Sequence, residues 1–167
     1  MRRFFESHLR ITILFAACVL VLGACGGSGE DGFDSTPGPA DLSTFSNDAI
    51  RVGGVDFEAW IAATDAQRTR GFMFATAEQL APLADGTPRG MLFVYPDDRR
   101  PSFFMRDTFV PLDLAFATVD GTIVEVHRLE PLDETRVTAS QPVRFALEAV
   151  EGTFAANAIG VGDRIDR

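Results

Sequence analysis

Short apolar runs, separated by clusters of Gly, Asp and Pro, dominate the chain from residue 50 onward. Runs of this length that are rich in Val, Ile and Phe are typical of β-strands. We therefore expect strands at residues 50–52, 55–62, 90–95, 102–107, 112–119, 122–129 and 143–150, with a last short strand after Gly162-Asp163.

Two dipeptides indicate where neighbouring strands reverse. Gly53-Gly54 joins the first two predicted strands, and Asp120-Gly121 joins the pair of strands on either side of it. We expect a type I′ turn at Asp120-Gly121, because both central residues of that turn need a positive φ. Pro96 is expected to end the strand before it. The run 143–150 alternates apolar residues with Arg144, Ala146 and Glu148, which is the period of a strand.

Three short helices are expected between the strands. Thr64 or Asp65 can cap a helix that ends at Arg70, a second helical turn covers Thr76–Leu80, and a third helix covers Thr153–Ile159. Many short strands with a few helices predict an α+β, mostly β fold. We expect one compact, barrel-like domain of short strands with one to three short helices.

The N-terminal residues have the pattern of a secretory leader. An n-region with Arg2, Arg3 and Arg10 precedes the apolar residues 11–22, a run too short for the roughly 20 residues of a membrane span. The sequence Leu-Gly-Ala-Cys that ends at Cys25 resembles the bacterial lipobox, in which a peptidase cuts before a lipidated cysteine. An ordinary signal peptide or a short anchor is the alternative.

These features predict three segments. Residues 1–24 form a lipoprotein signal peptide, residues 25–48 hold the lipidated Cys25 and a flexible tether rich in Gly, Ser, Asp and Pro, and residues 49–167 form the domain. We expect a cell-envelope protein, anchored by lipid at the periplasmic face of a membrane. Gly26, in place of an acidic residue after Cys25, weakly favours the outer membrane.

Composition narrows the chemistry. All 15 basic residues are arginine, so Schiff-base chemistry and a P-loop, which both need lysine, are excluded. The net charge of −9 argues against a nucleic-acid partner. Cys18 lies in the predicted signal peptide, which leaves Cys25 as the last cysteine and excludes a disulfide within the domain. His127 is the one histidine after the predicted signal peptide, which excludes a multi-histidine zinc site.

A set of longer motifs identifies a family. They are Arg68-x-Arg70-Gly71-Phe72-Met73, GMLFVYP at 90–96, SFFMRDTFVPLDLAF at 102–116, Asp120-Gly121, RFALEAVEG at 144–152 and IGVGD at 159–163. Together these motifs resemble DUF192, a bacterial and archaeal family without an established molecular function. The resemblance covers about residues 50–167. It implies a small barrel-like β-rich fold and a site, but no reaction.

Two of the differences from the pattern of this family change the charge of a side chain. The family usually has Phe-Trp-Met-Lys-Asn-Thr where this chain has residues 103–108, so that Asp107 replaces an asparagine. The family's Gly-Leu-Met-x-Arg becomes residues 71–75, with Ala75 in place of the arginine.

Three methionines within the motifs are candidates for metal binding. Met73, Met91 and Met105 carry soft thioether sulfurs that suit Cu(I), and His127 could add a nitrogen ligand. The alternative is that these methionines fill a core beside phenylalanines. We expect no cofactor, with copper as the alternative.

Polar residues within the same motifs are candidates for a pocket. Arg106, Asp107, Asp113 and Arg70 could line one pocket mouth, where arginine would bind a carboxylate or phosphate and paired acids could exchange protons. A structural network of ion pairs and turns is the alternative. The full candidate pocket is Arg70, Met73, Met91, Phe104, Met105, Arg106, Asp107 and Asp113.

These observations favour binding over catalysis, because nucleophiles and bases are scarce beside a dense cluster of aromatic, Met and Arg residues. We expect a non-catalytic binding or interaction module at the membrane surface, with an unknown protein or small molecule as its partner. A domain that binds a small molecule or a soft metal is the alternative, and a hydrolase-like enzyme is the third hypothesis. A deep pocket would favour a ligand, and a filled interior with an exposed apolar patch would favour a protein partner.

Overall fold

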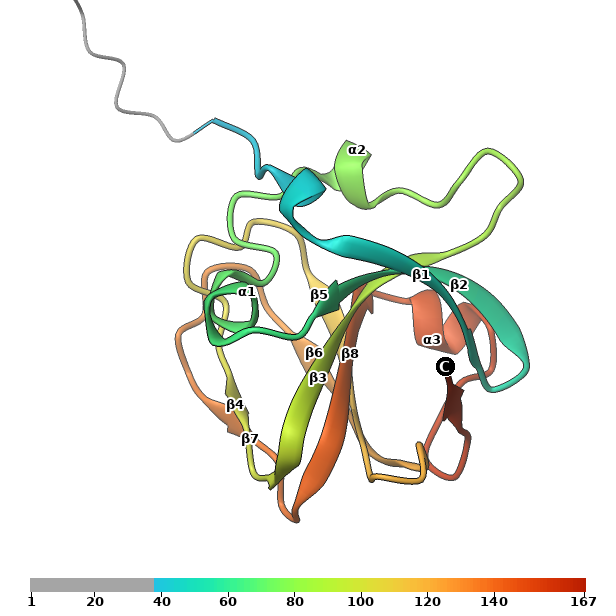
Figure 1. Ribbon diagram of the computed structural model, residues 1–167. Helices are drawn as coiled ribbons and strands as arrows, with labels where there is room; N and C mark the ends of the chain where they lie inside the picture. Colours follow the sequence, from blue (N-terminus) through green and yellow to red (C-terminus); the bar gives the residue numbers. More distant parts are fainter. Residues whose placement is uncertain (1–37) are drawn as a thin grey trace, which may run out of the picture. The chain divides into compact units, whose positions relative to one another are not determined.

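The computed structural model describes residues 38–167 (Figure 1). The predicted signal peptide, Cys25 and the tether up to residue 37 lie outside the described residues. No helix within residues 38–167 combines the length and the apolar character needed to cross a bilayer. The elements are η1 (Leu42–Thr44), β1 (Ser46–Val52), β2 (Val55–Ala62), α1 (Asp65–Arg70), α2 (Ala77–Leu80), β3 (Arg89–Arg99), β4 (Ser102–Phe103), β5 (Leu112–Ala117), β6 (Ile123–Leu129), β7 (Val137–Thr138), β8 (Val143–Val150), α3 (Thr153–Ala156) and β9 (Ile165–Asp166).

Seven strands form one curled sheet in the order β6-β5-β8-β3-β2-β1-β9 (Figure 1). Neighbouring strands are antiparallel except β2 and β3, which run parallel and are connected through α1 and α2. A parallel pair needs a crossover of about a dozen residues or more, which this connection supplies. β4 and β7 form a separate two-stranded ribbon. The predicted fold class, mostly β with three short helices in one compact domain, is confirmed.

The C-terminal residues connect the two edges of the sheet. β9 pairs with β1 through Val52 and Ile165. On the other side, the N–H of Ile165 donates to the carbonyl oxygen of Gly121 (2.9 Å), and the N–H of Ile123 donates to that of Asp163 (2.8 Å). Because β9 contacts both β1 and the start of β6, the sheet curls into a barrel-like shape.

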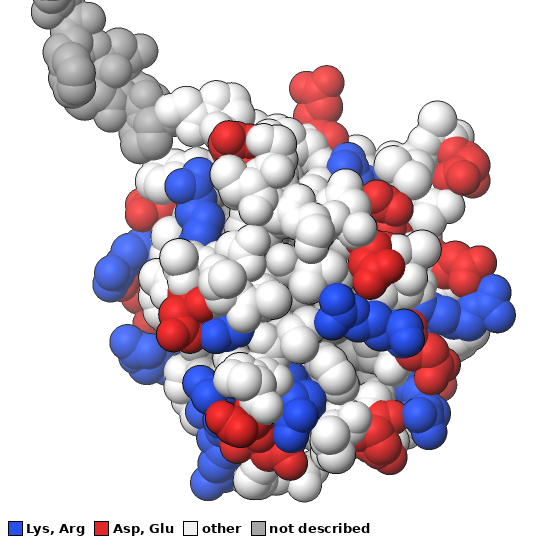
Figure 2. Space-filling view, viewed as in Figure 1, with Lys and Arg blue, Asp and Glu red and all other residues white. Residues whose placement is uncertain are grey.

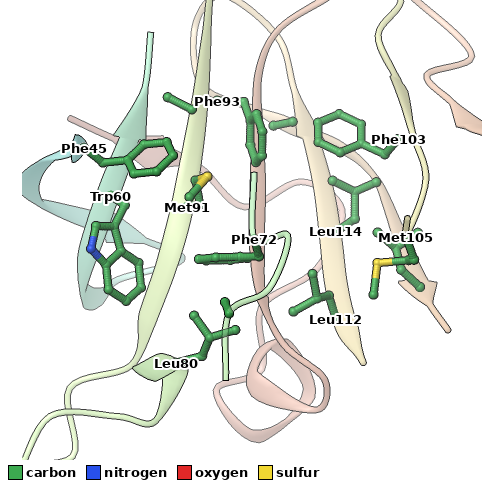
Figure 3. Close-up of a cluster of buried hydrophobic side chains, with 14 of the residues drawn as sticks. Phe45, Trp60, Phe72, Leu80, Met91, Phe93, Phe103, Met105, Leu112 and Leu114 are labelled. Carbon is green, nitrogen blue, oxygen red and sulfur yellow. The ribbon is translucent and has the colours of Figure 1, made fainter. Parts of the chain in front are cut away.

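The two faces of the sheet bury two separate apolar clusters. The inner core draws buried side chains from all seven strands and from α3, so it lies inside the curl; Leu92, Ala115 and Leu147 belong to it. The outer core covers the opposite face with Met91, Phe93, Leu114 and Phe116, together with residues of α2, β4 and the loops (Figure 3). Successive residues of a strand point to opposite faces, which explains why neighbours such as Met91 and Leu92 belong to different cores.

The hairpin at Asp120-Gly121 forms with a different turn from the one expected. Gly121 has a φ of +86°, but Asp120 keeps a negative φ. The N–H of Gly121 donates to the carbonyl of Thr118 (2.9 Å), and the N–H of Thr118 donates to that of Thr122 (3.0 Å), which describes a type I turn followed by a bulged glycine. The type I′ prediction is therefore wrong. A Cβ at Gly121 would also lie 2.3 Å from the carbonyl oxygen of Ile165. Only glycine therefore lets the backbone of β9 approach this turn so closely.

Two expected strand ends are also wrong. β3 continues through Pro96 to Arg99, and its register with β8 shifts between Val94 and Arg99. Proline is tolerated in a sheet at such an irregularity, because no regular ladder bond needs its missing N–H. The strand expected at 102–107 stops at Phe103. The chain turns there, and Asp107 has a φ of +53°, which a strand does not allow.

Local capping signals predict the first two helices correctly. The hydroxyls of Thr64 and Thr76 each accept from a backbone N–H three residues later, and Gln67 and Gln79 complete capping boxes. The third helix is shorter than the expected 153–159 and ends at Ala156.

Part of the predicted tether packs against the domain. Ala40, Leu42 and Phe45 are buried in the outer core, and β1 begins at Ser46. The amide of Gln79 donates to the carbonyl of Ala40 (2.7 Å), which joins this segment to α2. The described fold therefore begins before residue 49.

Candidate functional site

A pocket of about 390 Å³ lies on the outer face of the sheet, beside α1 and β4. Its size is typical of sites for small organic molecules. Aromatic side chains supply the walls, and charged side chains lie at the mouth. The lining residues used below are Phe72, Phe93, Tyr95, Phe103 and Phe104 for the walls, Asp65, Arg68, Arg70 and Arg99 for the mouth, and Gly71, Met73, Thr108 and Glu148.

Glu148 is the one acidic side chain of the pocket that is buried. It lies on β8 opposite Met91 of β3 and Leu114 of β5, and only 5% of its surface is exposed. Within residues 38–167, no hydrogen bond or ion pair reaches its carboxyl group. Burial raises the pKa of Glu148 to about 8. The carboxyl is therefore neutral at pH 7, because transfer from water disfavours the charged form.

Gly71 leaves the approach to this carboxyl open. It follows α1 with a φ of +47°, a conformation that glycine adopts without steric cost. A Cβ at this position would lie 3.6 Å from Phe93 and 4.0 Å from Oε2 of Glu148. The end of α1 thus passes directly beside the carboxyl without placing a side chain against it.

The aromatic walls pack edge to face. The ring centroids of Phe93 and Phe103 are 4.9 Å apart, and those of Phe103 and Phe116 are 5.6 Å apart. Such arrangements add roughly 1 kcal/mol per pair beyond the area that they bury. Figure 3 shows Phe93 and Phe103 with their rings directed toward each other across the outer core. The walls are therefore fixed by packing rather than by loop conformation.

Tyr95 joins the walls to the mouth. The guanidinium carbons of Arg68 and Arg99 lie 5.2 Å and 5.4 Å from its ring centroid. Burial raises the pKa of Tyr95 to about 12, so the phenol stays protonated at physiological pH. Cation–π contacts of this kind show that the aromatic faces of the pocket accept positive charge.

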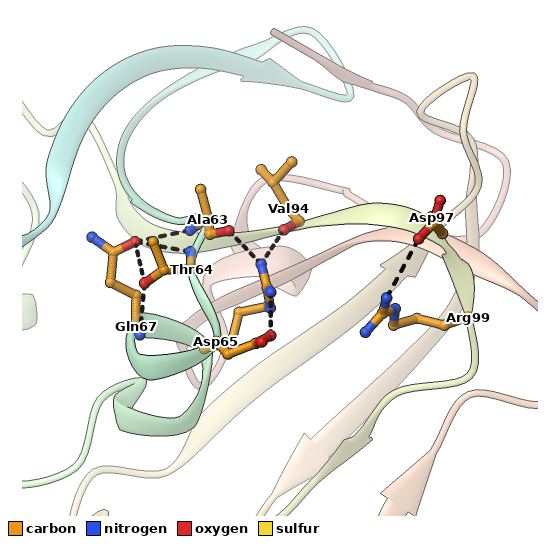
Figure 4. A network of polar contacts seen from close by, with 8 residues as sticks. Ala63, Thr64, Asp65, Gln67, Val94, Asp97 and Arg99 are labelled. Carbon is orange, nitrogen blue, oxygen red and sulfur yellow. Dashed lines mark hydrogen bonds and ion pairs between the residues drawn. The ribbon is translucent and has the colours of Figure 1, made fainter.

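Arg68 fixes α1 against β3 through contacts with Ala63, Asp65 and Val94, three residues that Figure 4 labels. Its Nη1 donates to the carbonyl oxygens of Ala63 (2.6 Å) and Val94 (2.7 Å), and its Nη2 pairs with Asp65 at 2.5 Å. The side chain of Arg68 is only 11% exposed, so this pair is shielded from solvent on the arginine side. The guanidinium of Arg68 thus forms its hydrogen bonds within the protein, and its role is to hold the pocket wall in place.

The eight residues predicted as a pocket separate into three places. Arg70, Met73 and Phe104 line the pocket. Met91 and Met105 are buried in the outer core, on β3 and after β4 (Figure 3).

The predicted polar residues make structural contacts outside the lining. Arg106 pairs with Glu134 at 2.5 Å. Asp113 accepts from the N–H of Phe154 (3.0 Å) at the start of α3. Among the residues that the structure describes, these contacts match the network of ion pairs and turns that was the alternative.

Asp107 contributes through its backbone. Its carbonyl oxygen accepts from the N–H of Phe74 (2.7 Å), which ties the turn after β4 to the loop after α1. Asp and Asn tolerate a positive φ better than most residues. The φ of +53° is therefore one that Asp107 adopts at lower steric cost than most residues would.

No metal centre assembles from hard ligands in the described part of the chain. Within residues 38–167, no three His, Cys, Asp or Glu side chains gather as a metal site would require. His127 lies on β6, hydrogen-bonded to Glu125 at 3.0 Å and edge to face with Phe116. Of the three methionines, Met73 alone lines the pocket. The copper alternative stays a prediction that copper titration can test.

The most distinctive group of the pocket, Glu148, was seen in the sequence only as one member of an alternating strand. Alternation indicates which face a residue occupies, but it does not indicate what covers that face. A usable signal lies in the neighbouring strands, where Met91, Phe93, Leu114 and Phe116 make the same face apolar. A glutamate on this face lies among apolar side chains, and the loops that cover them complete its burial.

Charges of both signs are interspersed over the face seen in Figure 2. On this face, neither sign of charge gathers into a patch of its own.

Comparisons with solved structures identify two similar proteins. A solved protein of unknown function from Novosphingobium aromaticivorans DSM 12444 is 28% identical, with a TM-score of 0.67, and the match covers 85% of this chain and 100% of that chain. A proposed transcription regulator from Sinorhizobium meliloti 1021 is also 28% identical, with a TM-score of 0.65, and covers 73% of this chain and 94% of that chain. No curated protein matches the chain.

The model of one protein family matches the domain almost from end to end. This family, DUF192, carries the description "Uncharacterized ACR", and the match spans residues 49–167. The match covers more than half of the chain and contains β8 with Glu148 and every lining residue of the pocket. The chain therefore belongs to the DUF192 family.

Proposed function

We propose that this protein is a non-catalytic binding module that holds a small organic molecule in the pocket over Glu148. The observation that carries the proposal is a buried carboxyl group that lines an aromatic pocket without a protein partner. Within residues 38–167, no side chain or backbone group forms a hydrogen bond or an ion pair with this carboxyl, and burial alone accounts for its raised pKa. The carboxyl is therefore free to form a hydrogen bond with a ligand in the pocket.

We also propose that the module works in the cell envelope. The lipobox-like sequence before Cys25 and the polar segment after it support a lipid anchor at the periplasmic face of a membrane. Incorporation of labelled fatty acid into the wild type, and its loss in Cys25→Ser, would support the anchor. Secretion of the wild type as a soluble protein would contradict it.

Native mass spectrometry of the full chain purified from membranes tests the binding function. We expect the wild type to carry a bound small molecule that is lost in Glu148→Gln. Glu78→Gln is the matched control, because Glu78 is an exposed glutamate of α2 outside the pocket lining. Wild-type protein that carries no added mass, or Glu148→Gln that retains the same mass, would contradict the proposal.

Acid–base catalysis is a second candidate function, favoured by one observation. Because burial raises the pKa of Glu148 to about 8, this group can both donate and accept a proton near neutral pH. An enzyme would convert its ligand, so the mass released from the wild type would differ from the mass added. A binding module would return the compound unchanged.

A further inference from the structure

Two of the three guanidinium groups that line the pocket have an ion-pair partner. Arg68 pairs with Asp65 at 2.5 Å, and Arg99 pairs with Asp97 at 3.8 Å. The guanidinium carbon of Arg70 lies 5.8 Å from the ring centroid of Phe74. All three guanidinium groups are therefore engaged by side chains of the protein.

Glu148 is the one acidic group of the lining without an ion-pair partner within residues 38–167. Its negative charge, when present, would face a space walled by aromatic rings. The faces of such rings carry negative potential and attract cations. Both the carboxylate of Glu148 and the aromatic walls of the pocket thus favour a positively charged group.

The geometry points to a ligand class, given the proposed function of this pocket: an organic ammonium ion with an apolar body. Its ammonium group would donate to the carboxylate of Glu148, and its body would lie against Phe93, Tyr95 and Phe103. A pocket of about 390 Å³ has room for an arylalkyl amine.

Binding of such a ligand is coupled to loss of a proton. The neutral acid of Glu148 releases its proton to solvent as the ammonium ion binds, so one positive charge replaces another and the site stays neutral. The other titratable groups that line the pocket are Asp65, Arg68 and Arg70 from α1, and Tyr95 and Arg99 from β3. Tyr95 stays protonated and uncharged below pH 8, since burial raises the pKa of Tyr95 to about 12. Affinity should therefore rise about tenfold from pH 6 to pH 7.

Three probes of one shape test the ligand class by calorimetry on the full chain. They are 2-phenylethylamine as the cation, 2-phenylethanol as the neutral form and 3-phenylpropanoate as the anion. We expect the amine to bind about tenfold or more tightly than the other two at pH 7. Its advantage should disappear in Glu148→Gln and persist in Glu78→Gln.

The outcomes separate the ligand class from the binding function. If the alcohol or the anion binds as tightly as the amine, the ligand class is overturned and the binding function stands. If no probe binds and no compound copurifies with the wild type, both are overturned. The comparison of pH 6 with pH 7 on the wild type needs no variant, and an affinity for the amine that does not change with pH also overturns the ligand class.

Discussion

Leu147 and Glu148 are adjacent on β8, yet their side chains lie on opposite faces of one sheet and in opposite surroundings. Leu147 is fully buried in the inner core, which draws apolar residues from every strand of the curled sheet. Glu148 is almost as buried, but it faces the outer side, where loops and a short ribbon leave a pocket. Two residues that are buried to a similar extent therefore have different roles: Leu147 packs in a core, and Glu148 lines a candidate site.

The difference follows from how each face is covered. Strands of the sheet itself and α3 close the inner face, so side chains there meet only other side chains. The outer face is covered by α1, α2 and the segments around β4 and β7, which are short and irregular. Irregular cover leaves space between its segments, and one such space reaches the carboxyl of Glu148.

The largest expected effect is the loss of a large inner-core side chain. Leu147→Ala should lower the free energy of unfolding by about 4 kcal/mol, because it removes buried methyl groups and leaves a cavity. Urea unfolding measures the change. Leu83→Ala is the control, since Leu83 is 38% exposed and should change stability little. Similar losses in both variants would show that the inner face is not closely packed.

The neighbouring residue should respond in the opposite direction. Glu148→Gln should raise the free energy of unfolding by about 3 kcal/mol at pH 7. In the unfolded chain this carboxyl has its ordinary pKa of 4.5, but burial raises the pKa of Glu148 to about 8 in the folded chain. Between these values folding takes up a proton, so wild-type stability is fully present below pH 4.5 and falls as the pH rises toward 8.

Glutamine cannot ionise, so Glu148→Gln removes this loss. The two proteins should unfold with nearly equal free energies at pH 4 and should diverge above it. Glu78→Gln, on the exposed face of α2, should follow the wild type throughout. A difference between wild type and Glu148→Gln that is the same at pH 4 and pH 7 would contradict the raised pKa.

A smaller effect is expected where β9 closes the inner face. Gly121→Ala should lower the free energy of unfolding by about 2 kcal/mol, because the new Cβ would meet the carbonyl oxygen of Ile165 at 2.3 Å. Gly54→Ala separates this clash from backbone strain. Gly54 has the same φ of +86°, but nothing lies within 4 Å of its added Cβ. Equal losses in the two variants would show that closure by β9 contributes nothing.

The smallest effect should come from the cover of the outer face. Thr64→Ala removes the cap of α1 and should lower the free energy of unfolding by about 1 kcal/mol. Thr64→Ser keeps the hydroxyl and should restore most of this stability, as thermal unfolding can show. If serine fails to restore it, the threonine contributes through its methyl group and not through the cap.

Local signals in the sequence were sufficient for the hairpin of β1 and β2 and for the starts of α1 and α2. Gly53-Gly54, Thr64 and Thr76 each determine the backbone within a few residues, so no distant contact can be decisive there. Pro96 shows the limit of such signals. It breaks strands in isolation, but here β3 passes through it because β8 and β3 pair again at Arg99.

Part of the site was also predictable from local sequence signals. Arg70, Met73 and Phe104 stand in motifs near turns, and the structure places all three at the pocket. Glu148 was not singled out, since its burial depends on loops that come from distant parts of the chain. The sequence suggests a role for the charge of Asp107. In the structure, Asp107 instead adopts a left-handed backbone conformation, and its carbonyl oxygen accepts a hydrogen bond from Phe74.

The most direct measurement is the titration of the Glu148 carboxyl itself. Carbon-13 NMR of the full chain, with the resonance assigned by its loss in Glu148→Gln, would follow the protonation of this one group. Because the carboxyl is buried and without a partner, the pKa of Glu148 should be about 8. A pKa near the ordinary 4.5 would mean that water or another residue already solvates the carboxylate, and it would contradict the assignment of Glu148 as the free group of a ligand pocket.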